Sequence, residues 1–184
     1  MTEQALEAIE ALLVARNPRS MQQARAALRP GYFLRAAQHL RDIRGTVFIA
    51  TGFPVTGTFE TDGPVGAIFL YRTLEELGAL PMLACGPPLS TRLRDDFRVL
   101  ELCARDLPAA QREARSQLAA LSPSAIISIE RPGLAADGHY YNMRGVDISE
   151  RCYFSSLLSP VPAARPSRSA TAATRSAWQY RRRR

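Results

Sequence analysis

The first forty residues place apolar side chains at the spacing of α-helices. Apolar positions recur every three or four residues over residues 6–13, and Asn17-Pro18 then interrupts the pattern. Ser20 is a suitable N-cap for a second, short helix that ends at Arg29-Pro30-Gly31. A third helix is predicted over about residues 32–43. We expect these three helices to be packing elements.

From residue 45 onward the pattern is that of buried strands separated by helices. Residues 46–50 form a short apolar run between two glycines, which is typical of a strand covered on both faces. A helix is predicted to begin at Pro64 and another to cover about residues 108–120. Further candidate strands cover residues 82–85, 98–102 and 125–129.

This alternation of strands and helices predicts an α/β fold. Parallel strands need crossover connections of about the length seen here, and helices usually supply them. We therefore expect a three-layer, mostly parallel, Rossmann-like sheet preceded by a helical segment. In such sheets ligands bind beyond the carboxyl ends of the strands.

The end of the first strand carries one group of candidate binding residues. Thr51-Gly52-Phe53 follows the apolar run, and Gly52 permits a close backbone approach. Thr61 or Asp62, before Gly63-Pro64, is expected to cap the next helix. The free N–H groups at that helix start suit a carboxylate or a phosphate. The simpler alternative is a capped helix without a ligand.

The end of the last predicted strand carries a denser polar segment. Arg131 is suited to bidentate binding of a carboxylate, and Glu130 and Asp137 are suited to proton transfer or to binding a cation. The alternative is structural, because Asp-Gly is a common turn and the tyrosines would then form a wall. We expect this segment to contribute binding or catalytic residues rather than packing alone. Its polar residues and the glycine of its turn are Glu130, Arg131, Asp137, Gly138, Tyr140, Tyr141, Asn142 and Arg144.

The charge of the chain is concentrated in its last part. The formal net charge is +7, but eight arginines and no acidic residue follow Glu150. Residues 1–150 therefore hold sixteen basic and seventeen acidic residues, a net charge of −1. A nucleic-acid partner is not expected, because no basic stripe extends into the predicted domain.

Cysteine usage and hydropathy exclude several other classes of protein. Cys85, Cys103 and Cys152 are odd in number and far apart, so we expect free thiols and no cysteine metal site. No cofactor or metal is expected, although the candidate acids leave an oxygen-bound metal open. No apolar run reaches eighteen residues, and the acidic N-terminus does not resemble a signal peptide. We expect a cytoplasmic protein without a membrane partner, and the number of subunits is left open.

Three segments together resemble the D-glutamate cyclase family, in its C-terminal domain. They are Ala50–Pro54, Glu60–Ala67 and Glu130–Asn142, in that order and at the family's spacing. The resemblance covers about residues 5–150. It implies interconversion of D-glutamate with 5-oxo-D-proline and water, a carbon–oxygen lyase reaction, and a small, acidic, amino-acid-like substrate.

The resemblance also implies roles for the candidate residues. Either the helix start at Pro64 or Arg131 would anchor the substrate carboxylate, and Asp62, Glu130 or Asp137 would transfer protons, with no ranking among the three acids. The alternative is a non-catalytic module that binds a small molecule or an anion. The remaining candidates for substrate binding are Thr51, Gly52, Phe53, Thr61, Gly63, Gly138, Tyr140 and Asn142.

The family pattern stops at about residue 150, where the family continues with a glycine-rich acidic loop. Residues 169–178, read from GC-rich codons one base earlier, become Ile-Gly-Asp-Gly-Gly-Asp-Glu-Ile-Gly-Met, which matches that loop. We therefore interpret residues 1–150 as the N-terminal part of the α/β domain and residues 151–184 as an aberrant, basic, disordered tail. A frameshift between Arg151 and Ser169 is expected to leave the chain inactive.

Overall fold

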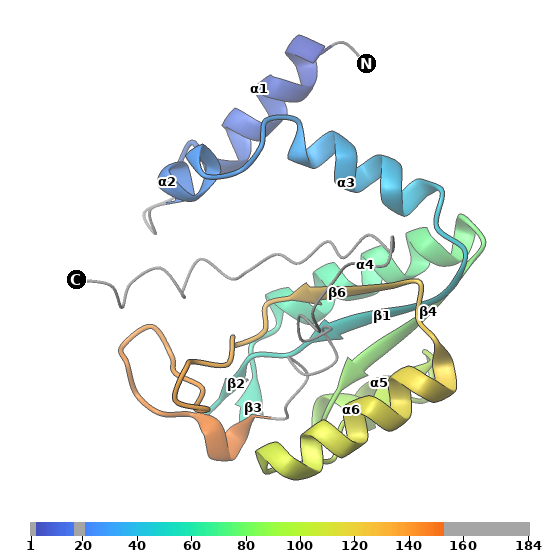
Figure 1. The fold of residues 1–184 in the computed structure, drawn as a ribbon, viewed down its shortest axis with the longest axis vertical. Helices are drawn as coiled ribbons and strands as arrows, with labels where there is room; N and C mark the ends of the chain where they lie inside the picture. Colours follow the sequence, from blue (N-terminus) through green and yellow to red (C-terminus); the bar gives the residue numbers. More distant parts are fainter. Residues whose placement is uncertain (1–2, 17–20, 153–184) are drawn as a thin grey trace. The chain divides into compact units, whose positions relative to one another are not determined.

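A computed structural model of the chain describes residues 3–16 and 21–152, which form two compact units (Figure 1). Residues up to Asp42 form a helical unit, and the residues from Ile43 onward form an α/β unit. The proposed cap at Ser20 lies outside the described residues. The predicted tail began at residue 151, but Arg151 lies in a 3-10 turn and Cys152 is buried. The rest of that tail, from residue 153 onward, lies outside the described residues.

The helical unit contains the three predicted helices, α1 (Glu3–Val14), α2 (Met21–Ala26) and α3 (Tyr32–Arg41). A buried carboxylate joins the first to the third. Glu10 of α1 is only 2% exposed, and it accepts hydrogen bonds from the backbone N–H groups of Gly31 and Phe33, at 3.3 and 2.9 Å. These N–H groups lie at the start of α3 and have no partner within the helix, so Glu10 satisfies them.

The α/β unit is built on a four-stranded parallel sheet, which confirms the predicted α/β class. The strand order is β5-β4-β1-β6, and each neighbouring pair is parallel. All four predicted strands are present. They are β1 (Gly45–Thr51), β4 (Ala79–Cys85), β5 (Val99–Glu101) and β6 (Ala125–Ile129).

Helices cover both faces of this sheet. Along β1, Phe48 and Ala50 point to one face and pack in a core cluster with Ala114 of α6 (Leu107–Leu121). The alternate residue Thr51 points to the opposite face, toward α4 (Asp62–Glu76). The sheet is therefore the middle of three layers, as Figure 1 shows.

The structure adds short elements that the sequence pattern did not reveal. A hairpin of β2 (Pro54–Val55) and β3 (Thr58–Phe59) follows β1, and α5 (Leu89–Leu93) follows β4. A two-residue strand is too short for alternation to be recognised in the sequence. In addition, α4 begins at Asp62, two residues before the predicted start at Pro64.

The segment after β6 folds into a second core cluster. Isolated antiparallel bridges join Leu134 to Tyr140 and Tyr141 to Asp147, and a 3-10 turn, η1 (Ser149–Arg151), ends the segment. The cluster combines this segment with the start of α6, through the buried residues Ala104, Ala110, Tyr140, Ile148 and Cys152.

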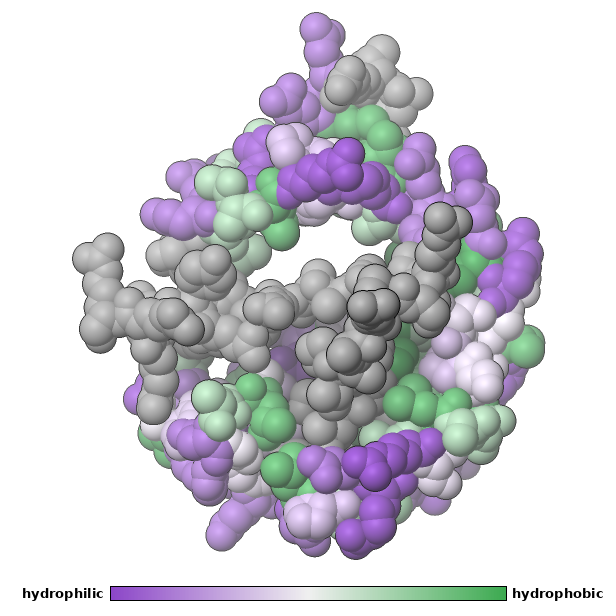
Figure 2. Space-filling view, viewed as in Figure 1, coloured by the Kyte–Doolittle hydropathy of each residue, from purple (hydrophilic) through white to green (hydrophobic). Residues whose placement is uncertain are grey.

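Hydrophobic residues lie in several separate patches on the face of the α/β unit seen in Figure 2. Large apolar side chains that are exposed in this unit include Val65, Phe69 and Leu80. None of the helices in the described part of the chain has both the length and the apolar character needed to cross a bilayer.

Two leucines of β4 provide a test of the buried sheet. Leu83 is fully buried, whereas Leu80 on the same strand is 52% exposed. We expect Leu83→Ala to lower the free energy of unfolding by about 2–5 kcal/mol, because it removes apolar contacts and leaves a cavity. Leu80→Ala is the matched control and should change it by about 0.5 kcal/mol or less. Urea unfolding followed by circular dichroism measures both, and equal effects would contradict the burial pattern.

Candidate functional site

The carboxyl ends of β1 and β6 meet at the point where the order of the strands reverses. From β1 the chain proceeds through α4 to β4 on one side, whereas β6 pairs with β1 on the other side. A crevice is expected at such a switch point, beyond the strand ends. The register pairs Thr51 with Ile129, so Thr51-Gly52 and Glu130-Arg131 become neighbours.

Arg131 links the two strand ends. Its Nη1 atom donates to the carbonyl oxygen of Gly52 at 2.7 Å and lies 3.4 Å from that of Thr51, 80 positions away in the sequence. Burial lowers the pKa of the guanidinium, although the group stays charged at neutral pH. Gly52 has φ +99°, and a Cβ there would lie 2.9 Å from the Leu89 side chain. A glycine is therefore required at this position.

A pocket of about 210 Å³ opens at these strand ends. Arg131 and Arg151 give it two positive charges, and the β2–β3 hairpin supplies apolar wall through Val55 and Phe59. Such a lining suits a small anionic molecule with a short apolar part. The remaining predicted residues that line it are Thr51 and Gly52.

Cys85 also lines the pocket but is not a nucleophile at neutral pH. Burial raises the pKa of its thiol to about 12, and the nearby Arg131 offsets this only in part. The thiolate is the reactive form of cysteine, so Cys85 acts as an apolar wall. All three cysteines are free, as the sequence predicted.

Two of the three candidate acids lie together at the start of α4. Glu60, Asp62 and Glu130 each place one carboxylate oxygen within 4.8 Å of the others, and all three are exposed. Asp62 Oδ1 accepts a hydrogen bond from the N–H of Gly63 at 3.0 Å. Thr61 occupies the N-cap position, but its side chain makes no cap hydrogen bond. Glu60 was not among the predicted site residues, although it lies two residues before Asp62 and begins the second of the three segments that resemble the family.

Gly63 allows α4 to approach the end of β6. A Cβ atom at position 63 would lie 2.6 Å from Glu130 Cβ and 3.3 Å from Thr51 Oγ1. Glu130 itself has φ +47°, an unusual conformation for a residue with a side chain. Gly63, predicted to bind substrate, therefore has a packing role that brings Asp62 and Glu130 together.

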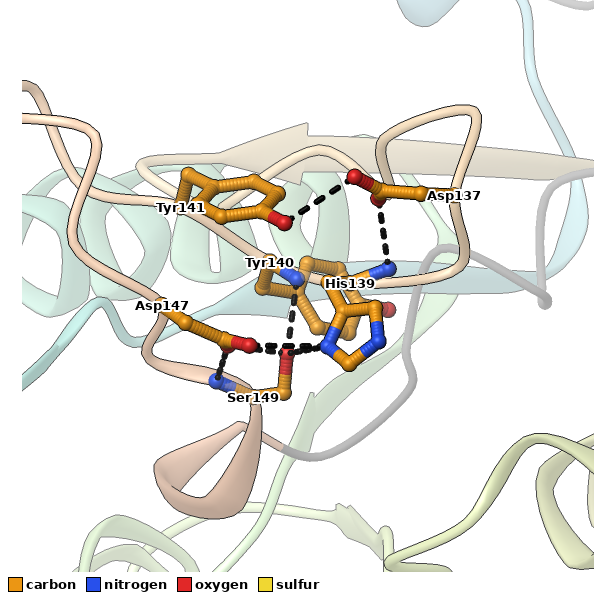
Figure 3. A network of polar contacts seen from close by, with 6 residues as sticks. All are labelled: Asp137, His139, Tyr140, Tyr141, Asp147 and Ser149. Atoms are coloured by element: carbon orange, nitrogen blue, oxygen red, sulfur yellow. Dashed lines mark hydrogen bonds and ion pairs between the residues drawn. The ribbon is translucent and has the colours of Figure 1, made fainter.

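The third candidate acid, Asp137, belongs to a separate polar network (Figure 3). It accepts hydrogen bonds from the N–H of His139 at 3.1 Å and from the Tyr141 hydroxyl at 2.9 Å. Asp147 lies 2.8 Å from His139 Nδ1 and accepts from the Ser149 hydroxyl at 2.6 Å. Because the hydroxyl donates to Asp147, this arrangement differs from a catalytic triad, in which serine donates to histidine.

The remaining candidates in this segment shape its turns and its core. Gly138 has φ +84°, and Asn142 Oδ1 accepts from the N–H groups of Arg144 and Val146. Tyr140 is fully buried, and Phe53 packs against the same second cluster. Within the described residues, the pocket lining includes none of Asp62, Glu130, Asp137, Gly138, Tyr140 and Asn142.

Comparison with known families gives one match. The model of the family described as D-glutamate cyclase-like, C-terminal, matches residues 9–155, which is most of the chain. No curated protein matches the chain.

Two glycines of α4 test the close approach to β6. Gly63→Ala should lower the free energy of unfolding by about 1–3 kcal/mol, because the new methyl group would clash with Glu130. At Gly66 the nearest atom to an added Cβ is 3.9 Å away, so Gly66→Ala should be neutral or stabilise the helix by up to about 1 kcal/mol. Urea unfolding of both variants measures this difference, and a neutral Gly63→Ala would refute the contact.

The Asp147 network makes a prediction about pH. Hydrogen bonds from the Ser149 side chain and N–H lower the pKa of Asp147, and His139 adds to this. A lowered pKa in the folded state stabilises the fold above the ordinary aspartate pKa, and this stabilisation is lost as the pH falls through the lowered value. Ser149→Ala should raise the pKa of Asp147 toward its ordinary value in an NMR titration. Ser116→Ala, an exposed serine on α6, should leave it unchanged.

Proposed function

The chain belongs to the D-glutamate cyclase-like, C-terminal family, and on this premise we propose that its α/β unit carries the site for interconverting D-glutamate with 5-oxo-D-proline and water. The observation that carries the proposal is the pocket at the switch point, where Arg131 and Arg151 face a space suited to a small anion. Proteins with open α/β sheets bind their ligands beyond the carboxyl ends of the strands, at such a switch point.

The reaction sets three requirements for the site. The amine nitrogen forms a bond to the side-chain carboxyl carbon, a carbon–oxygen bond breaks, and the oxygen leaves as water. A base must take a proton from the ammonium group, an acid must give one to the leaving oxygen, and an anchor must hold the α-carboxylate. Arg131 is the proposed anchor, since its guanidinium lies at the pocket wall.

Asp62 and Glu130 are the proposed proton-transfer groups that the geometry favours. They lie at the same sheet edge as Arg131, and Glu130 precedes it directly in the chain. Asp137 remains a third candidate, although both of its carboxylate oxygens accept hydrogen bonds within its own segment. The proposed substrate is a small acidic amino acid.

We further propose that the chain as it stands does not complete the reaction. Residues 169–178 match the family's glycine-rich acidic loop only in the adjacent reading frame, so these positions do not present that loop. A second candidate function, binding of a small anion without turnover, is favoured by one observation: two arginines, and none of the three candidate acids, line the pocket.

Restoring the reading frame tests the proposed activity. The chain as it stands and a version with the frame restored after Arg151 are incubated with D-glutamate or L-glutamate, and 5-oxoproline is followed by NMR. We expect the restored version to turn over D-glutamate but not L-glutamate, and the chain as it stands to turn over D-glutamate at least about a hundredfold more slowly. Turnover in neither version would support the anion-binding alternative, and binding of D-glutamate would then be measured by calorimetry.

Within the restored version, single substitutions separate the proposed roles. Glu130→Gln and Asp137→Asn should each lower kcat about a hundredfold or more if that acid transfers a proton. Arg131→Gln should raise KM strongly, because it removes the anchor. Asp95→Asn, an exposed acid after α5, is the control and should leave the rate unchanged. Rates near the unsubstituted value for all three site variants would remove the assignment.

A further inference from the structure

We infer that Glu60, Asp62 and Glu130, with the hydroxyl of Thr51, form a binding site for a divalent, oxygen-preferring metal cation of the Mg²⁺ or Mn²⁺ class. The three carboxylates come from the end of the β2–β3 hairpin, the first turn of α4 and the residue after β6. This inference goes beyond the proposed cyclase reaction and does not depend on it.

The first argument is the charge of the group. One oxygen from each carboxylate lies within 4.8 Å of the other two, so three negative charges repel each other at short range. Among the ion pairs formed by described residues, none includes Glu60, Asp62 or Glu130. The positive end of the α4 dipole offsets part of this repulsion, but that effect is equivalent to only about half a charge.

The second argument is the hydroxyl of Thr51, which is independent of the acids. Thr51 is fully buried, and its Oγ1 atom has no hydrogen-bond partner among the described residues. A buried hydroxyl without a partner costs free energy, so such groups usually have one. A Cβ atom placed on Gly63 would lie 3.3 Å from Thr51 Oγ1 and 3.3 Å from Glu130 Cγ. The hydroxyl therefore lies beside the stem of the Glu130 side chain, on the face of β1 that packs against the start of α4.

The third argument is the shape of the site. Any side chain at position 63 would fill the space between Thr51 and Glu130, since its Cβ would lie 2.6 Å from Glu130 Cβ. Glu130 itself occupies the space that such a Cβ would need, so Gly63 allows the two donors to converge by close packing. The neighbouring Asp62 is held by the Gly63 N–H, at 3.0 Å, so one of its oxygens is already oriented.

The donor set defines the class of cation. All of the donors are oxygens, and the group contains no histidine or cysteine. Carboxylate and hydroxyl oxygens suit Mg²⁺ and Mn²⁺, whereas Zn²⁺ sites are usually built from histidine and cysteine. Three carboxylates exceed the charge of a divalent cation, so such a cation would remove most of the repulsion.

Titration of the full chain with Mn²⁺, without any substrate, tests the site. Electron paramagnetic resonance of free Mn²⁺ gives the stoichiometry and the affinity, and we expect one ion per chain, displaced by Mg²⁺. Glu60→Gln and Glu130→Gln should each weaken binding about tenfold or more, because each removes a charged ligand. The exposed neighbours Asp95 and Asp96 provide the control, since Asp95→Asn with Asp96→Asn removes two charges away from the site and should leave binding unchanged.

Thr51→Val separates a ligand role from a structural one. The variant has nearly the same shape but lacks the hydroxyl, so in EDTA it should keep or raise the melting temperature. In saturating Mn²⁺ its gain in melting temperature should be smaller than that of the unsubstituted chain. Equal gains would exclude Thr51 as a contact of the bound ion. Binding that is weaker than about 10 mM, or that is unchanged in both glutamine variants, would overturn the inference.

Because the titration contains no substrate, its outcome is separate from that of the cyclase assay. Absence of turnover in the frame-restored chain, together with tight Mn²⁺ binding, would refute the proposed reaction and keep the metal site. Turnover in the frame-restored chain with no Mn²⁺ binding would do the reverse.

Discussion

The parallel pairing of β1 with β6 is the constraint on which the candidate site depends. It joins segments about eighty residues apart and places the residues that follow each strand at one edge of the sheet. Backbone hydrogen bonds fix the register, so Thr51 lies opposite Ile129 and the next residues emerge side by side. The hydrogen bond from Arg131 to the Gly52 carbonyl continues this link beyond the sheet. Without the pairing, the two polar segments would be unrelated loops.

Consecutive residues at the end of β6 contribute to two different environments. Glu130 lies against Gly63 and the start of α4, whereas Arg131 lies at the pocket wall. The strand ends at Ile129, and Glu130 has φ +47°, so the backbone turns between the two residues and directs their side chains to different surroundings. The site therefore has an acidic side at α4 and a basic side at the pocket, with Thr51 common to both.

The basic side suits binding of a carboxylate, and the acidic side suits proton transfer or binding of a cation. A guanidinium in a partly apolar pocket binds a carboxylate strongly because little water competes with it. A group of carboxylates can move protons or hold a cation, and the same residues can be tested for both. Asp137, which the sequence placed with the other acids, instead supports the fold-back of the segment after β6.

Elements with a strong hydrophobic period could be predicted well. The four strands of the sheet and the helices α4 and α6 all lie within one to three residues of their predicted positions. Buried strands are apolar throughout, and long helices repeat their pattern several times, so the signal in each is large. The β2–β3 hairpin and α5 were missed because strands of two residues and a helix of five are too short for the pattern to repeat several times.

The sequence by itself determined the fold class, the sheet edge on which to look and the chemical types present there, because these follow from local periodicity and from residue identity. Only the tertiary structure decided which candidates meet. It brought Glu60 to Asp62 and Glu130, placed the buried Thr51 hydroxyl beside Glu130, and used Tyr140 and Asn142 for packing and turns. The physical reason is that convergence depends on side-chain direction and on close backbone approach at Gly63, and neither is encoded by spacing along the chain.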